Sequence, residues 1–190
     1  LVQRILLGRH SLNTASLLNE FRVARSKADI VILNGTSTAY EIKSDRDSLA
    51  RLPHQLEDFR RHFAKVAVVT SENHIKQLER VAPPDVGILM LTRSFSIRTI
   101  REPEPRPELI DAVSLIDSLR VGEAKRVIQR LGDEIPEVPN TAIRTELREI
   151  VARKEPLEVH ESVVKVLRES RSQSNLWDFI ERLPDSLNSV

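Results

Sequence analysis

The chain has 190 residues and a net charge of +1, with 40% hydrophobic and 30% charged residues. This balance is typical of a globular protein and excludes one that binds nucleic acid through bulk positive charge alone. The absence of cysteine excludes disulfides, thiolate zinc sites and cysteine nucleophiles. The lack of cysteine fits a reducing cytoplasm, which is the expected location. No apolar run approaches the ~20 residues of a membrane span, so we expect no membrane contact.

The first part of the chain mixes helical and strand patterns. Residues 1–21 place apolar side chains at helix-like intervals, which predicts helices there. Residues 28–35, ADIVILNG, form a buried-strand pattern that ends in the turn signal Asn34-Gly35. Residues 37–43, STAYEIK, read as a second strand. The turn between the two predicts an antiparallel hairpin.

A polar loop and a helix follow the hairpin. Residues 44–51 are polar, and residues 52–63 have a helical pattern with Pro53 suited to the first helical position. This places Gln55 in the first turn of that helix. Residues 64–70, AKVAVVT, are mostly apolar, which favours a central parallel strand.

One more helix and two more strands complete this half. Residues 71–82 predict a helix with Ser71 as its N-cap. Residues 86–92 and 94–102 have strand patterns. The fold class expected is therefore α/β or α+β, with a mixed sheet flanked by helices.

The pattern changes at a proline-rich segment, residues 102–108, which has three prolines in seven residues and predicts a stiff linker. The expected organisation is a core at 1–101, this linker, and an all-helical region at 109–190. Five short amphipathic helices are predicted in the last region, at residues 108–119, 122–132, 141–153, 156–170 and 175–183.

Charged residues in the two hairpin strands are the candidate site. Asp29 lies near the start of the first strand, and Glu41 and Lys43 lie at the end of the second. A hairpin would bring the two acids side by side. Side chains alternate along a strand, so Glu41 and Lys43 share a face while Ile42 points into apolar packing.

Two carboxylates beside a lysine predict a divalent metal site. Mg²⁺ or Mn²⁺ takes one or two carboxylates and completes its shell with water and substrate phosphates. Asp29, Glu41 and the backbone carbonyl of Ile42 would supply the ligands. Lys43 would orient an attacking water or stabilise charge on the phosphate. The competing interpretation of Glu-x-Lys is an ordinary solvent-facing strand with an unrelated aspartate.

The motif resembles the PD-(D/E)XK nuclease superfamily, because Asp29 and the sequence Glu-Ile-Lys are followed by Gln55 in a helix. A narrower similarity extends over most of the chain, to a bacterial family with the pattern R-A-D-I, then Y-E-I-K-S-D-x-D-x-L-x-R-L-x-x-Q. VRR-type nucleases are more distantly similar. This resemblance implies a restriction-endonuclease-like mixed sheet flanked by helices.

The resemblance also implies roles for individual residues. Asp29, Glu41 and Lys43 match the catalytic triad, and Gln55 matches a helix glutamine that touches the lysine, a water or the scissile backbone. Glu20 matches an upstream acid on the first helix, which binds metal directly or through water.

Two positions depart from the narrower pattern: Lys27 stands in place of Arg, and Phe59 in place of Tyr.

The function implied is hydrolysis of phosphodiester bonds in DNA with Mg²⁺ or Mn²⁺. The alternative is an inactive nuclease fold that binds nucleic acid or a partner protein. Arg46 and Arg51 are candidate phosphate contacts, although solvated loop charges explain them equally well. The C-terminal helices are the expected surface for a homodimer or a partner protein.

Overall fold

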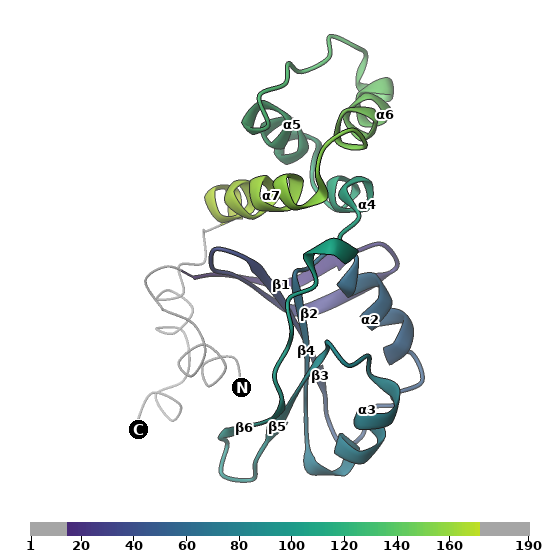
Figure 1. Ribbon diagram of the computed structural model, residues 1–190, viewed down its shortest axis with the longest axis vertical. Helices are drawn as coiled ribbons and strands as arrows, with labels where there is room; N and C mark the ends of the chain where they lie inside the picture. The colour runs from purple at the N-terminus through teal and green to yellow at the C-terminus, as the bar shows by residue number, and fades with distance from the viewer. Residues whose placement is uncertain (1–14, 172–190) are drawn as a thin grey trace.

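The computed structural model describes residues 15–171, which form a mixed six-stranded sheet with helices on one face and a further group of helices at one end (Figure 1). The strands lie in the sheet in chain order. They are β1 (Ser16–Val23), β2 (Ser26–Leu33), β3 (Ser37–Lys43), β4 (Lys65–Thr70), β5 (Gly87–Leu91) and β6 (Ile97–Arg101).

The helices fall into two groups. Those beside the sheet are α2 (Leu52–Arg60), the short η1 (Glu72–His74) and α3 (Ile75–Val81). The C-terminal group is η2 (Pro107–Leu109), α4 (Ala112–Asp117), α5 (Val121–Arg130), α6 (Asn140–Val151) and α7 (Pro156–Arg171). The expected fold class is confirmed, since a mixed sheet flanked by helices carries a helical C-terminal extension.

Strand directions divide the sheet into three parts. Strands β1, β2 and β3 form an antiparallel meander, β3, β4 and β5 run parallel, and β6 returns antiparallel to β5. The hairpin expected between residues 28 and 43 and the central parallel strand at 65–70 are both confirmed.

Strand β1 contradicts the helix predicted over residues 11–21, as far as that range is described. Residues Ser16–Val23 pair with β2 along nearly their whole length. The misleading signal has a physical cause, because Leu18 and Phe21 are three residues apart yet belong to the same apolar cluster, and Glu20 between them adopts a positive φ of 54°. This break in alternation mimics helical spacing of apolar residues.

Two apolar clusters cover the two faces of the sheet. The helix-side core joins Val31 and Ala39 of the sheet to Leu56 of α2 and Leu78 of α3. The far-side cluster contains Ile30, Ile32, Tyr40, Val69 and other sheet residues. Helices α2 and α3 lie on the first of these faces (Figure 1).

The proline-rich segment is extended but is not a free linker. The backbone N–H of Glu104 donates to Asp85 O at 3.0 Å, and that of Arg106 donates to Ala64 O at 2.9 Å. Beyond it, α4 to α7 contribute Leu115, Val127 and Val163 to the same helix-side core. The helical extension therefore shares one continuous core with the sheet.

Four of the five predicted C-terminal helices match α4 to α7, whereas the predicted helices at 175–183 and 1–10 lie outside the described residues. Within residues 15–171, none of the helices combines the length and apolar character needed to cross a bilayer.

Candidate active site on strands β2 and β3

The β2–β3 hairpin places Asp29 beside Glu41. The paired register ends at Ile30 opposite Tyr40, and the two acids follow directly beyond this pair, where both line one cleft. The connecting turn has Gly35 at φ +72°, where glycine has no steric cost. The Asp29 carboxylate reaches across to β3, where its Oδ2 accepts the backbone N–H of Ile42 at 2.8 Å. The predicted juxtaposition of the two acids is confirmed.

Side-chain alternation breaks at Asp29 itself. Ala28 and Ile30 are two residues apart, yet Ala28 belongs to the helix-side core and Ile30 to the far-side cluster. The neighbouring strand breaks at the same level, at Glu20. Asp29 thus sits at a local irregularity of the sheet, where its carboxylate bonds to the β3 backbone instead of lying flat on one face.

Glu41 and Lys43 share the face that α2 covers, as expected. Lys43 Nζ donates to Glu41 Oε1 at 2.7 Å, and this pair is largely buried, with side-chain exposures of 12% and 4%. Ile42 points the other way and packs against the far-side cluster. The backbone N–H of Ile42 donates to Asp29. That its carbonyl oxygen binds a metal remains a prediction.

Gln55 closes the cluster from α2. The helix begins at Leu52 with Pro53 in its first turn, which places the Gln55 amide over the end of β3. Gln55 Oε1 accepts from Lys43 Nζ at 3.0 Å, and Gln55 Nε2 donates to Glu41 Oε1 at 2.8 Å. The contact with the lysine that the resemblance implied is therefore present, and it extends to the acid.

The electrostatics of Glu41 favour a cation. Burial raises the pKa of Glu41, and the nearby Asp29 charge raises it further, while hydrogen bonds from Lys43 and Gln55 act in the opposite direction. Within the described part of the chain, Glu41 Oε2 is buried without a hydrogen-bond partner. A buried carboxylate oxygen with no donor, next to a second carboxylate, fits a bound divalent ion.

The number of protein ligands is small. Among residues 15–171, no group of three or more histidine, aspartate or glutamate side chains is gathered closely enough to hold a metal. Asp29 and Glu41 would supply two carboxylates, leaving the remaining positions to water and phosphate oxygens. This is the usual manner in which Mg²⁺ binds at phosphoryl-transfer sites.

The cluster opens into a cleft of about 870 Å³ that runs between the β1–β2 turn and α2. Of the two arginines predicted to contact phosphates, Arg51 lines this cleft, whereas Arg46 lies on the exposed loop outside its lining. The lining also contains residues that were not predicted as part of the site, among them the cations Arg25 and Lys27, His54, and the acids Glu57 and Asp58. A signal was available, since Arg25 and Lys27 flank the start of the strand that carries Asp29.

Glu20 does not occupy a helix, contrary to the prediction. It lies on β1 with an exposed side chain, and its Oε1 accepts from Lys27 Nζ at 2.7 Å. The hydrogen bond to Lys27 lowers the pKa of Glu20. Glu20 is absent from the lining of the cleft. Its predicted helical position is therefore wrong, because the helix-like spacing came from a sheet irregularity.

The two aspartates after Lys43 organise the loop. Asp47 accepts from the backbone N–H of Ser44 at 2.7 Å, as a turn residue does. Asp45 accepts from Ser71 Oγ and from Asn73 Nδ2. Ser71 stands at the N-cap of η1, but its side chain donates to Asp45 and does not cap the helix.

Comparisons with known proteins place the chain in a family. A solved structure, the SPO1766 protein of unknown function from Silicibacter pomeroyi, is similar over 64% of this chain and 82% of its own, with 18% identity and a TM-score of 0.42. Protein cII of Enterobacteria phage P4 is 40% identical over 80 residues, which are 41% of this chain and 30% of the relative's length. The family model described as bacteriophage P4 protein cII matches residues 1–189. The chain therefore belongs to the bacteriophage P4 protein cII family.

Proposed function

We propose that this protein is a divalent-metal-dependent nuclease that hydrolyses phosphodiester bonds of DNA. The observation that carries the proposal is the convergence of Asp29, Glu41 and Lys43 at the head of one cleft, with Glu41 Oε2 buried and unpartnered in the described structure. This arrangement supports the PD-(D/E)XK resemblance of the sequence.

Each residue has a distinct task in the proposed reaction. Asp29 and Glu41 would hold Mg²⁺ or Mn²⁺, which polarises a phosphate oxygen and lowers the pKa of a bound water. Lys43 keeps its ammonium group at the carboxylates and supplies positive charge where the phosphate gains negative charge. Gln55 fixes the orientation of both side chains through its two hydrogen bonds.

The cleft offers cations for the DNA backbone. Arg25, Lys27 and Arg51 line it together with the carboxylate pair, and so do the acids Asp47, Glu57 and Asp58. Arginine and lysine neutralise phosphates and thereby release counterions, which favours binding irrespective of base sequence. Arg46 remains a predicted contact from the adjacent exposed loop.

A second candidate is an inactive nuclease fold that binds nucleic acid or a partner protein. The observation that favours it is the Lys43–Glu41 ion pair at 2.7 Å, which already balances one of the two acidic charges without a metal. The homodimer or partner contact expected through the C-terminal helices, and the cytoplasmic location expected from the sequence, remain proposals.

A cleavage assay on supercoiled, linear and branched DNA with Mg²⁺, Mn²⁺ or EDTA tests the proposal. Asp29→Asn and Lys43→Met should each lower the cleavage rate at least 100-fold, because each removes a group at the reacting phosphate. Glu79→Gln, on the exposed surface of α3, is a matched carboxylate control that should cleave like the parent.

Metal binding provides a readout independent of cleavage. Titration with Mn²⁺ followed by electron paramagnetic resonance should show one site in the parent and a weakened site in Asp29→Asn. Cleavage that persists unchanged in Asp29→Asn and Lys43→Met would refute the nuclease assignment. DNA binding without Mn²⁺ binding or cleavage would support the inactive-fold alternative.

A further inference from the structure

The tip of the β5–β6 hairpin carries the most exposed large apolar side chain among the described residues. Phe95 is 70% exposed, compared with 47% for Leu157 and 40% for Val81. Its backbone has a φ of +57°, a left-handed conformation that bulky residues rarely adopt. The chain thus places an aromatic ring in solvent at a position where neither burial nor backbone preference favours it.

The turn geometry shows why phenylalanine is unusual at position 95. Phe95 N donates to Thr92 O at 3.0 Å, and Thr92 N donates to Ser96 O at 2.8 Å. A turn followed by one left-handed residue is a common hairpin connection, and glycine is its default residue at that position. Glycine would therefore stabilise this hairpin turn better than phenylalanine does.

Hydroxyl groups hold the tip in one conformation. Thr92 Oγ1 lies 2.9 Å from Ser94 Oγ and 2.7 Å from Ser96 Oγ, and it also accepts the backbone N–H of Ser96 at 3.1 Å. The ring of Phe95 is therefore presented by a bonded turn. A turn whose backbone is fixed in advance loses less conformational entropy when it meets a ligand.

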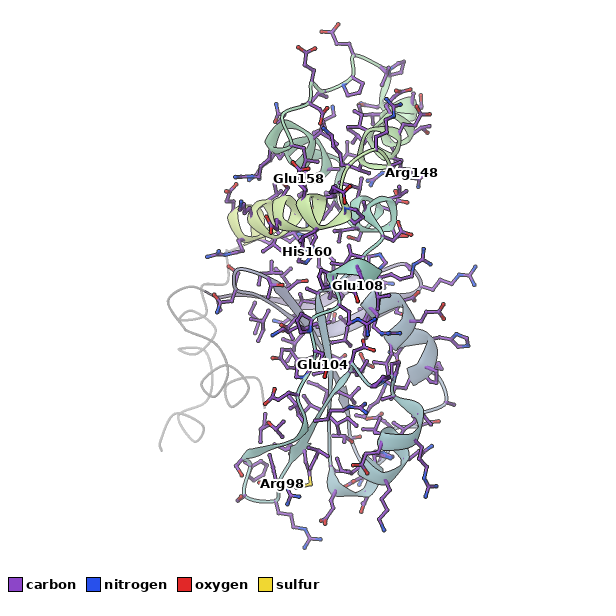
Figure 2. The ribbon with its side chains drawn as sticks, viewed as in Figure 1. Arg98, Glu104, Glu108, Arg148, Glu158 and His160 are labelled. Carbon is purple, nitrogen blue, oxygen red and sulfur yellow. The ribbon has the colours of Figure 1, made fainter. Side chains whose placement is uncertain are left out.

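The charge around Phe95 is positive. From Leu91 to Arg101 the sequence has three arginines and no acid. Arg101 is engaged with the backbone oxygens of Val86 and Pro83, whereas Arg93 and Arg98 are exposed. Figure 2 shows Arg98 near the far end of the hairpin. The hollow beside the hairpin is also lined by two acids, Glu72 and Asp45, of which Asp45 is bonded to Ser71 and Asn73.

The tip projects from the same edge of the sheet as the candidate site. Lys43 lies opposite Thr70, and Thr70 lies opposite Met90, because β3, β4 and β5 run parallel. Two strand spacings separate Lys43 from Met90, about 10 Å. The chain then continues directly from β5 into the turn at Thr92, beyond that edge (Figure 1).

We propose that this hairpin tip is a second DNA-binding element, in which Phe95 stacks on an unpaired base and Arg93 and Arg98 contact the flanking phosphates. The inference rests on the proposed function, since it extends that site's substrate to DNA with unpaired bases. An exposed aromatic ring stacks on the face of any base that is not already stacked, and neighbouring arginines add electrostatic attraction. Intact duplex hides those faces, so single-stranded DNA is the preferred occupant.

Binding to a fluorescently labelled 20-nucleotide oligo-dT, measured by anisotropy with the full chain in EDTA, tests the proposal without requiring cleavage. Phe95→Ala should weaken binding about 10-fold, within the range for loss of one base–aromatic stack. Arg93→Gln and Arg98→Gln should each reduce the slope of log affinity against log salt by about 0.7. Leu157→Ala is the matched control, since it removes an exposed apolar side chain on α7.

A second variant separates function from folding. Phe95→Gly relieves the left-handed backbone, so its melting temperature should equal or exceed that of the parent while its affinity for oligo-dT falls. Equal affinity of Phe95→Ala and the parent would overturn the proposal, as would Phe95-dependent self-association without DNA binding. The two hypotheses fail separately. Lost cleavage in Asp29→Asn with unchanged binding in Phe95→Ala refutes only the DNA-binding role of the hairpin tip. Weakened binding in Phe95→Ala without any cleavage by the parent refutes only the nuclease.

Discussion

His160 of α7 and Ser37 at the start of β3 share a buried hydrogen bond of 2.7 Å, although 123 residues separate them. Ser37 Oγ also accepts the backbone N–H of Ala64 at 3.1 Å. His160 points from α7 toward the sheet, whereas Glu158 of the same helix lies on its outer side (Figure 2). This bond ties the helical extension to the strand that carries Glu41 and Lys43.

Stability should depend on pH through His160. Burial lowers the pKa of His160 from 6.5 to about 4, and its Nδ1 has no hydrogen-bond partner in the described structure. The unfolded chain takes up this proton more readily, so the stabilisation is complete above pH 6.5 and is lost as the pH falls toward 4. The loss should be about 3 kcal/mol.

Urea titrations at several pH values measure this effect. His160→Gln should flatten the decline in unfolding free energy between pH 6.5 and 4, leaving the part due to His62, whose pKa burial also lowers. The exposed His54→Gln variant should retain the parent slope. An unchanged slope in His160→Gln would show that its imidazole is not buried in solution.

Gly87 should tolerate no side chain. A Cβ there would lie 2.8 Å from both N and Cδ of Pro103 in the extended proline-rich segment. Gly87→Ala should therefore destabilise the protein by about 1–3 kcal/mol, the usual effect of overpacking. Gly122→Ala on α5 is the matched control, since nothing lies within 4 Å of its Cβ and alanine favours the helix by up to ~1 kcal/mol. Melting temperatures that shift in the same direction would contradict this packing.

The ion pair between Arg60 and Asp85 should be worth more than exposed pairs. Its two hydrogen bonds are 2.7 and 2.8 Å long, and the Asp85 side chain is 4% exposed. Asp85→Ala leaves the Arg60 charge unpaired and should lower the unfolding free energy by about 2–4 kcal/mol. Glu169→Ala, which breaks the exposed pairs with Arg126 and Arg130, should cost less than ~1 kcal/mol. Chemical denaturation measures the unfolding free energy of both variants. Equal losses of unfolding free energy would show that the buried pair contributes no more than the exposed ones.

Gln55 should affect the rate of cleavage more than stability. Gln55→Leu removes the two hydrogen bonds that orient Lys43 and Glu41, so cleavage under the proposed function should fall about 10–100-fold. Gln77→Leu, an exposed glutamine on α3, provides the control for the same substitution elsewhere. Single-turnover kinetics on DNA measure both, and a parent-like rate in Gln55→Leu would exclude an orienting role.

Local signals were sufficient for the centre of the site. The Asn-Gly turn fixes the β2–β3 pairing, and two-residue alternation then places Glu41 and Lys43 on one face. Pro53 marks the start of α2, so the position of Gln55 in the first turn of that helix also follows from sequence. These features depend on short stretches of chain, where pattern and geometry are closely linked.

Features that depend on distant contacts were not predictable. The irregularity at Glu20 disguised a strand as a helix, because spacing alone does not distinguish a break in alternation from a helical turn. The proline-rich segment read as a linker, since its bonds to Asp85 and Ala64 come from the sheet core. The partnership of Ser37 and His160 has no local signal at all.

The shared core has a practical consequence for anyone who would dissect this protein. Truncation at the proline-rich segment would remove Leu115, Val127 and Val163 from a cluster to which Val31 and Ala39 also belong. Both fragments would then expose apolar surface and tend to aggregate. The core also connects α7 to the candidate site, since His160 of α7 bonds to Ser37, and Ser37 and Lys43 are the two ends of one strand. A partner that displaces α7 would therefore displace the strand that carries Lys43.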